Sequence, residues 1–160
     1  MLDQMGKVLS EYKDLKNGKR TVHEILTMAS IIECESKSVE GRKDVASVFY
    51  NRMDKGISLG SDVTTYYAFK IKLWERELTY AEINTNNPYN TRGPNMISKL
   101  PVGPIASASK SSIEAALSPN KTDYLFFVAD KNGDLYFTKT QGEHDRIIRE
   151  LKSEDLWYTY

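Results

Sequence analysis

The sequence predicts an α+β fold with helices early in the chain, a loop-rich middle, a late antiparallel hairpin and a C-terminal helix. Three observations support this class. Capping boxes of the form S/T-x-x-E, which satisfy orphan amides at helix starts, begin at Thr21, Thr79, Ser111 and Thr140. The segment Asp130–Asp134 contains Asn-Gly and separates two short β-type segments, which predicts a hairpin. Strands do not alternate with helices along the chain, which argues against a βαβ fold.

The first third of the chain is expected to be helical. Apolar residues at helical spacing predict a short amphipathic helix over residues 2–16. The capping box at Thr21 starts a second helix, which should run to about Ser36. Ser38 is a candidate cap for a third helix, which Gly56 ends with a left-handed residue.

The remaining elements follow in order. Residues 57–104 mix short helical signals with turn residues, so we expect ordered, functional loops there. The box at Ser111 opens a short helix that ends before Pro119. The predicted strands are Tyr124–Ala129 and Leu135–Thr138, and the last helix packs inward through Ile147, Ile148 and Leu151.

Charge and hydropathy exclude two classes of partner. The 22 Lys and Arg residues balance 22 Asp and Glu residues, and no segment concentrates basic side chains, so nucleic acid is not an expected partner. No apolar run approaches the roughly 20 residues that span a bilayer, and no signal-peptide core is present, so we expect no membrane span in this chain.

No metal or cofactor is expected either. The pair His23-Glu24 begins like a zinc-binding H-E-x-x-H motif, but Thr27 occupies the second ligand position. The single cysteine, Cys34, excludes an internal disulfide and receives no role. His144 and Asp145 are interpreted as surface or capping groups, because no nucleophile is identifiable beside them.

One carboxylate lies on the apolar stripe of the helix predicted after Thr21. With about 100° of rotation per residue, Glu33 falls within that stripe and Glu35 falls on the side expected to face solvent. A carboxylate that loses hydration has a raised pKa, which makes Glu33 a candidate general acid. The alternative is a helix-rim residue paired with an arginine such as Arg52.

Several segments, in order, resemble the endolytic murein transglycosylases, the YceG-like family. They are TMASIIECES (Thr27–Ser36), Gly41–Tyr67, PYNT (Pro88–Thr91), LPVGPIA (Leu100–Ala106), Ser112–Asp130 and KTQGEHDR (Lys139–Arg146). The resemblance implies that residues 21–160 form the catalytic domain and that residues 1–20 form a preceding helix.

The resemblance also implies a reaction and a catalytic residue. The glutamate of the family's A-S-I-x-E string falls on Glu33, which would act as general acid and then as base. The implied reaction cleaves the β-1,4 bond between N-acetylmuramic acid (MurNAc) and N-acetylglucosamine (GlcNAc) in peptidoglycan and forms 1,6-anhydroMurNAc ends. The attacking hydroxyl belongs to the substrate, so one carboxylate suffices.

Other residues in or beside the matching motifs are candidates for substrate binding. These are Asp62, Tyr66, Tyr89, Asn90 and Arg52. For each a structural alternative stays open: an Asx-turn for Asp62, core packing for the tyrosines and a solvated helix end for Arg52. The chain also departs from the family string S-D-P-T, because Val63 stands where proline is usual.

The expected partners follow from the same resemblance. They are peptidoglycan glycan strands and the cell-wall synthases, at the extracytoplasmic face of a bacterial membrane, with a native anchor outside this chain. Two rival functions remain: a hydrolytic muramidase that uses Glu33 and Asp62, and a non-catalytic glycan-binding module.

Overall fold

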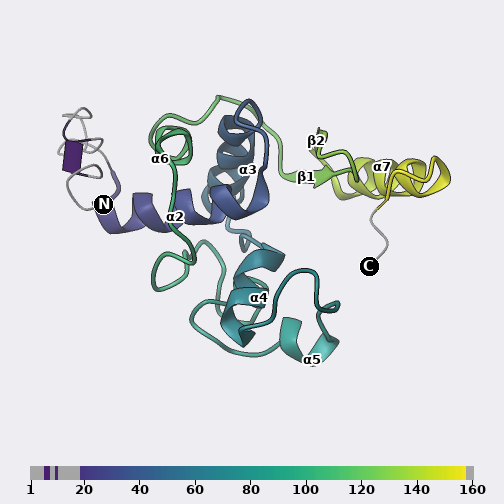
Figure 1. Ribbon diagram of the computed structural model, residues 1–160, viewed down its shortest axis with the longest axis horizontal. Coiled ribbons are helices and arrows are strands. Elements are labelled where there is room, and N and C mark those ends of the chain that lie inside the picture. The colour runs from purple at the N-terminus through teal and green to yellow at the C-terminus, as the bar shows by residue number, and fades with distance from the viewer. Residues whose placement is uncertain (1–5, 8–9, 11–18, 158–160) are drawn as a thin grey trace.

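A computed structural model describes residues 6–7, 10 and 19–157 of the chain. The helix expected over residues 2–16 lies largely outside the described residues. The elements are α2 (Val22–Glu35), α3 (Arg42–Asp54), α4 (Asp62–Phe69), α5 (Tyr80–Ile83), α6 (Lys110–Leu117), β1 (Phe126–Ala129), β2 (Leu135–Thr138) and α7 (Gln141–Ser153). Within these described residues the order is helices, a late hairpin and a last helix, which confirms the predicted α+β class (Figure 1).

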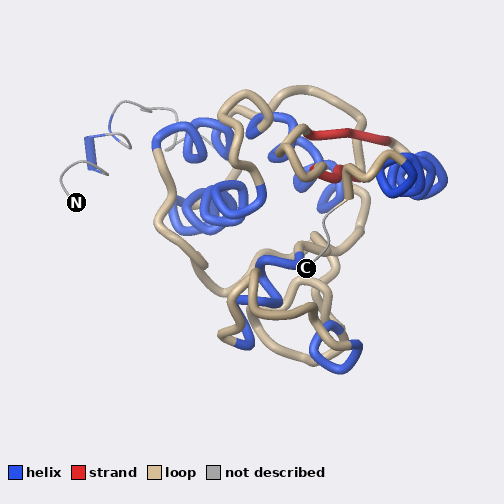
Figure 2. The backbone as a smooth tube through the Cα atoms, turned by 45° about the vertical axis from the view of Figure 1, so that its right-hand side comes forward, coloured by secondary structure: helices blue, strands red, loops and turns tan. Residues whose placement is uncertain are grey.

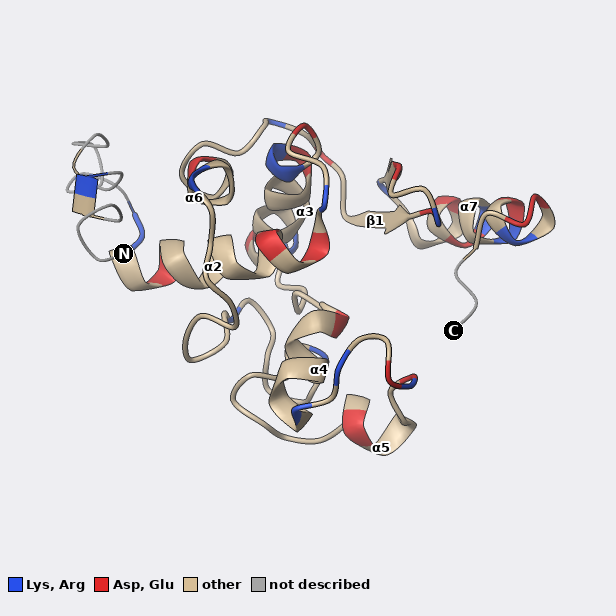
Figure 3. Cartoon of the chain, in the orientation of Figure 1, with Lys and Arg blue, Asp and Glu red and all other residues tan. Residues whose placement is uncertain are grey.

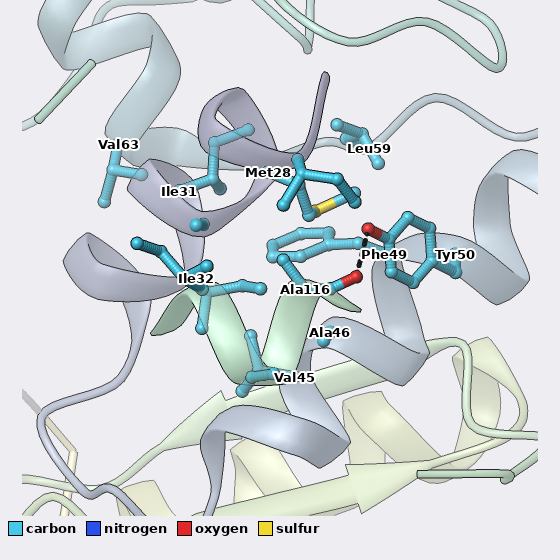
Figure 4. Close-up of a cluster of buried hydrophobic side chains, with 14 residues drawn as sticks. Met28, Ile31, Ile32, Val45, Ala46, Phe49, Tyr50, Leu59, Val63 and Ala116 are labelled. Carbon is cyan, nitrogen blue, oxygen red and sulfur yellow. Dashed lines mark hydrogen bonds between the residues drawn. The ribbon is translucent and has the colours of Figure 1, made fainter. Parts of the chain in front are cut away.

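The core lies where α2, α3 and α6 pack together. Met28, Ile31 and Ile32 of α2 are fully buried there, and Phe49 of α3 is 1% exposed. Figure 4 shows how these side chains interlock around Phe49. The hydroxyl of Tyr50 donates to the carbonyl of Ala116 at 2.7 Å, which ties α3 to α6 within the same cluster (Figure 4).

The hairpin and α7 lie together at one side of this helical core in both views (Figures 1 and 2). β1 and β2 pair antiparallel, with Phe126 opposite Thr138. The turn depends on Asp130, whose buried carboxylate accepts hydrogen bonds from the amides of Asn132 and Asp134, and on Gly133, whose φ is +91°. α7 packs on both strands and β1 contacts α3. Basic and acidic residues both occur along α7 (Figure 3).

Three of the four predicted capping boxes are present. The side chains of Thr21, Thr79 and Thr140 each accept the amide of the glutamate three residues later, and that glutamate bonds back to the cap. The fourth prediction was wrong, because α6 begins with Ser109 as its N-cap rather than Ser111. The helix predicted to follow Ser38 also begins later than expected.

That third helix, α3, has Gly41 as its N-cap in place of the predicted Ser38. The Ser38 hydroxyl instead donates to Glu40. Gly56 follows the helix with φ of +70°, as predicted. In the middle region, α4 is a full helix that starts at Asp62, so this aspartate belongs to a helix rather than to a loop. α4 packs against α2, and α5 packs against α4.

Candidate active site

A cavity of about 330 Å³ lies between the helical core and the hairpin. Its walls come from the end of α2, from α3, from the segment that enters α4, from β1 and from α7. The polar side chains that line it are Glu35, Arg52, Ser61, Asp62, Arg92, Gln141 and His144. Phe126 and Phe127 supply aromatic surface beside them. A concave site with a few converging polar groups and aromatic walls is typical of ligand binding.

Glu35 is a half-buried acid in the wall of this cavity. The hydroxyl of Ser61 donates to Glu35 Oε1 at 2.5 Å. Burial of the carboxyl group raises its pKa to about 7, and the charge of Asp62 acts in the same direction. The hydrogen bond from Ser61 and the charge of Arg92 oppose this shift without cancelling it. A carboxyl that is partly protonated near neutral pH has the property required of a general acid.

Glu33 differs from the prediction in pKa and in partners. Its Oε1 pairs with Arg42 Nη2 at 3.1 Å, so the alternative of a carboxylate paired with an arginine holds, with Arg42 in place of Arg52. Its Oε2 accepts the amide of Ser109 at 2.9 Å and the hydroxyls of Ser109 and Ser112 at 2.6 and 2.7 Å. Burial raises the pKa of Glu33, but these bonds and Arg42 together lower it below its usual value. The predicted raised pKa was therefore wrong.

These contacts give Glu33 a structural task. Its carboxylate holds the first turn of α6 through the Ser109 amide, which would otherwise be an orphan donor. The Ser109 hydroxyl is bound to Glu33 and caps no amide of its own helix. Glu33 does not line the cavity described above.

The surroundings of the two glutamates are the reverse of those predicted, and the cause is the packing of α2. α2 contacts α3, α4 and α6, so more than one of its faces is buried. At about 100° per residue, Glu35 lies between Met28 and Ile31 on the helical wheel, and both of these are fully buried. The apolar pair on that face is a sequence signal that was available for Glu35 but was not used.

Asp62 and Arg52 line the same cavity as Glu35, as a shared binding role requires. Asp62 is exposed and forms an ion pair with Arg92. Arg52 donates from Nε to the carbonyl of Ser58 at 2.8 Å and from Nη1 to that of Leu125 at 2.9 Å. Main-chain carbonyls thus fix the guanidinium, and the prediction that both side chains bind substrate stays a prediction.

The tyrosines lie elsewhere. Tyr66 and Tyr89 line a second cavity of about 490 Å³, together with Tyr67. Tyr66 is 6% exposed and its hydroxyl donates to the carbonyl of Arg76 at 3.0 Å. Tyr67 is 44% exposed and its ring lies 4.9 Å from that of Tyr89. Of the predicted tyrosines, Tyr66 therefore has the packing contacts of a core residue.

Asn90 is fully buried and lines neither cavity. Its amide nitrogen donates to the carbonyls of Glu82, Ile83 and Thr85 at 2.9–3.0 Å. Its Oδ1 accepts the hydroxyl of Thr65 at 2.7 Å. These bonds fasten the loop after α5 to α4, so the structure gives Asn90 a bracing position away from the cavity.

Sequence reasoning missed His144 and Gln141. Both lie on the first turn of α7 and line the cavity, so His144 is not a surface group. Helical spacing places residues three apart on one face of a helix, but only the folding of α7 onto the hairpin directs that face toward Glu35. His144 and Gln141 lie more than 100 positions after Glu35 in the sequence, so no local pattern connects them with it.

Within residues 19–157 and the few described before them, no cluster of three or more His, Cys, Asp or Glu side chains could hold a metal ion. Over the same part of the chain, every helix is too short or too polar to cross a bilayer.

Comparisons with known proteins identify the relatives of this chain. A sequence profile described as the YceG-like family matches residues 1–150. A Bacillus subtilis (strain 168) protein named endolytic murein transglycosylase is 45% identical over 147 residues, covering 91% of this chain and 39% of that protein. A Streptococcus pneumoniae (serotype 2, strain D39) protein of the same name is 37% identical over 162 residues, covering 98% of this chain and 29% of that protein.

A solved structure agrees with these matches. The crystal structure of a YceG-like protein from Listeria monocytogenes superposes with a TM-score of 0.82 at 42% identity, over 92% of this chain and 47% of that chain. The chain thus spans less than half the length of each of these relatives. The profile match over most of its residues, together with this fold, shows that the chain belongs to the YceG-like family.

Proposed function

We propose that this chain is a catalytic domain that cleaves peptidoglycan glycan strands at the β-1,4 bond between MurNAc and GlcNAc. The relatives named endolytic murein transglycosylases support the substrate class. The observation that carries the proposal is the carboxyl of Glu35, whose pKa is raised to about 7 in the wall of the cavity. We assign the acid to Glu35 in place of Glu33.

In the proposed reaction, protonated Glu35 donates its proton to the glycosidic oxygen as the bond to the anomeric carbon breaks. The resulting carboxylate then accepts the proton of the muramyl C6 hydroxyl, whose oxygen bonds to that carbon and closes a 1,6-anhydro ring. Because the attacking hydroxyl is part of the bound sugar, its effective concentration is high and no carboxylate nucleophile is needed.

The neighbours of Glu35 suit these steps. The hydrogen bond from Ser61 to Oε1 fixes the orientation of the carboxyl group. Asp62 keeps negative charge at the same wall, where it raises the pKa of Glu35 and would stabilise positive charge that develops on the sugar. Arg92 pairs with Asp62 and so limits this effect.

The test compares two matched substitutions, Glu35→Gln and Glu33→Gln. Gln keeps the shape of the side chain but cannot transfer a proton, so Glu35→Gln should lower the rate of glycan cleavage by about 10²–10⁴-fold. Glu33→Gln should leave the rate within about tenfold of the original chain, provided that both are assayed where they are folded. Loss of activity in Glu33→Gln alone would return the assignment to Glu33.

The rate should also depend on pH in a defined direction. Glu35 must carry its proton at the start of the reaction, so kcat/KM, which reports the pKa values of the free enzyme, should fall as the pH rises through about 7. A kcat/KM that stays constant from pH 5 to pH 9 contradicts the acid role of Glu35.

A hydrolytic muramidase is the second candidate, because Asp62 lines the same cavity as Glu35 and is a possible base toward water. Mass spectrometry of the digested glycan separates the two reactions. 1,6-AnhydroMurNAc ends support the lytic reaction, whereas reducing ends that have gained water support hydrolysis. If neither product forms with the folded chain and glycan still binds, the third possibility, a non-catalytic glycan-binding module, is correct.

We also propose that the protein acts at the extracytoplasmic face of a bacterial membrane, near cell-wall synthases. The support is the cell-wall substrate in the names of the relatives. The anchor would lie in sequence outside the described residues. Fractionation of cells and fluorescence microscopy of the tagged protein test this placement, and a cytoplasmic signal contradicts it.

A further inference from the structure

His144 is a polar side chain of α7 that contacts the aromatic wall of the cavity. Its ring stacks on that of Phe126, with centroids 5.4 Å apart and an angle of 28° between the ring planes. The guanidinium of Arg52 also lies over the Phe126 ring, at 5.3 Å from its centroid. The His144 ring is therefore held in place by packing, in a cavity that also contains Glu35.

The two ring nitrogens of His144 have different surroundings. Nδ1 is buried and has no hydrogen-bond partner among the described residues. Nε2 does not belong to these buried atoms without a partner. A neutral imidazole carries its proton on one nitrogen and a lone pair on the other. A buried N–H without an acceptor is rarer and more costly than an unpaired acceptor. The proton of neutral His144 therefore belongs on Nε2.

The charged groups around His144 favour this neutral form. Burial lowers the pKa of His144, and the positive charge of Arg52 on α3 acts in the same direction. Asp145 on α7 opposes them, but the net direction remains downward. Near neutral pH the ring thus presents a neutral Nε2–H.

We propose that His144 is a substrate-binding residue of the cavity that holds Glu35, and that its Nε2–H donates a hydrogen bond to an acceptor oxygen of the glycan. Suitable acceptors are a sugar hydroxyl oxygen or an acetamido carbonyl oxygen. This inference rests on the proposed function, since it takes the glycan as the ligand. It makes α7 and the hairpin the wall of the site opposite Glu35.

The first test reads the ring directly. Nitrogen-15 NMR distinguishes the two neutral tautomers, and the chain contains only two histidines to assign. We expect His144 to carry its proton on Nε2, and a proton on Nδ1 overturns the inference. A murein glycan fragment is then titrated into the Glu35→Gln variant, which cannot cleave it. The Nε2 signal of His144 should shift, and a titration that leaves it unchanged overturns the inference.

The second test uses substitutions that mimic one nitrogen each. The amide of His144→Gln reaches the position of Nε2, that of His144→Asn reaches the position of Nδ1, and His144→Phe keeps only the ring. We expect kcat/KM to fall about tenfold in the Asn and Phe variants, the effect of one lost hydrogen bond, and to stay within about threefold in the Gln variant.

The controls separate this inference from the proposed function. His23 lies outside the cavity, where its Nε2 contacts the carbonyl of Val102 at 2.9 Å, so His23→Gln should leave kcat/KM unchanged. If His144→Gln is as impaired as His144→Phe while all variants melt at the same temperature, His144 does not bind through Nε2. Full activity of Glu35→Gln would instead refute the proposed acid. The role of His144 would then be decided by the kcat/KM values of its own variants.

Discussion

The main stability prediction concerns Glu35→Gln. Relative to the original chain, its free energy of unfolding should increase as the pH rises. In the folded chain the pKa of Glu35 is raised from 4.5 to about 7, chiefly by burial. Below pH 4.5 both the folded and unfolded states hold the proton. As the pH rises from 4.5 to about 7, the unfolded state loses the proton while the folded state keeps it, so stability is lost through this range. Gln has no proton to lose and escapes this loss.

The size of the effect follows from the shift. One pKa unit corresponds to about 1.4 kcal/mol, so the rise from 4.5 to about 7 corresponds to about 3 kcal/mol. The difference in unfolding free energy between Glu35→Gln and the original chain should therefore grow by about 3 kcal/mol between pH 4.5 and pH 8. Any constant effect of Gln on the bond from Ser61 cancels, because only the change with pH is compared.

Urea denaturation followed by tryptophan fluorescence, at intervals from pH 4.5 to pH 8, measures this difference. Glu33→Gln is the matched control, because the pKa of Glu33 is lowered, so its charge stabilises the fold above pH 4.5 and this contribution is lost as the pH falls. Between pH 4.5 and pH 8 the difference for Glu33→Gln should therefore stay nearly constant, because the folded chain binds the proton of Glu33 only below this range. A pH-independent difference for Glu35→Gln would refute the burial of its carboxyl.

Three further substitutions test the structural roles. Glu33→Gln should destabilise the chain by about 2 kcal/mol at neutral pH in thermal melts, because Arg42 is left buried with a weaker partner; an unchanged melting temperature contradicts this. Asn90→Ala should cost about 3 kcal/mol in denaturation, because it removes a fully buried hydrogen-bonding side chain, whereas a loss of glycan affinity without destabilisation would restore its predicted binding role. Gly60→Ala should cost about 1–2 kcal/mol, because φ is +64° and the new Cβ would lie 3.2 Å from Arg52 Nη2; circular dichroism melts check this, and a neutral result contradicts it.

The local signals in the sequence were reliable where the structure depends on neighbouring residues. The capping boxes at Thr21, Thr79 and Thr140 and the Asn-Gly hairpin all form as predicted. The prediction at Ser111 failed because a residue distant in sequence, Glu33, binds the first turn of α6. A cap chosen by a tertiary contact leaves no local pattern.

The same distinction applies to the site. The motif TMASIIECES predicted an acid in the last turns of α2, and the proposed acid Glu35 lies two residues after Glu33 in the same helix. A helical wheel assumes one buried face, and that assumption fails for a helix packed by three others. His144 was missed for a related reason, because its neighbours Phe126 and Arg52 come from other elements.

The sequence by itself determined the family, the α+β class and the starts of α2, α5, β2 and α7, because these depend on ordered motifs and on interactions across a few residues. Only the tertiary structure decided which of two glutamates lies in the cavity and which braces a helix. The physical reason is that a carboxyl pKa depends on the solvent and charges around the group. For Glu35 those surroundings include Asp62 of α4 and Ser61, the N-cap residue of that helix. For Glu33 they come from α3 and from the start of α6.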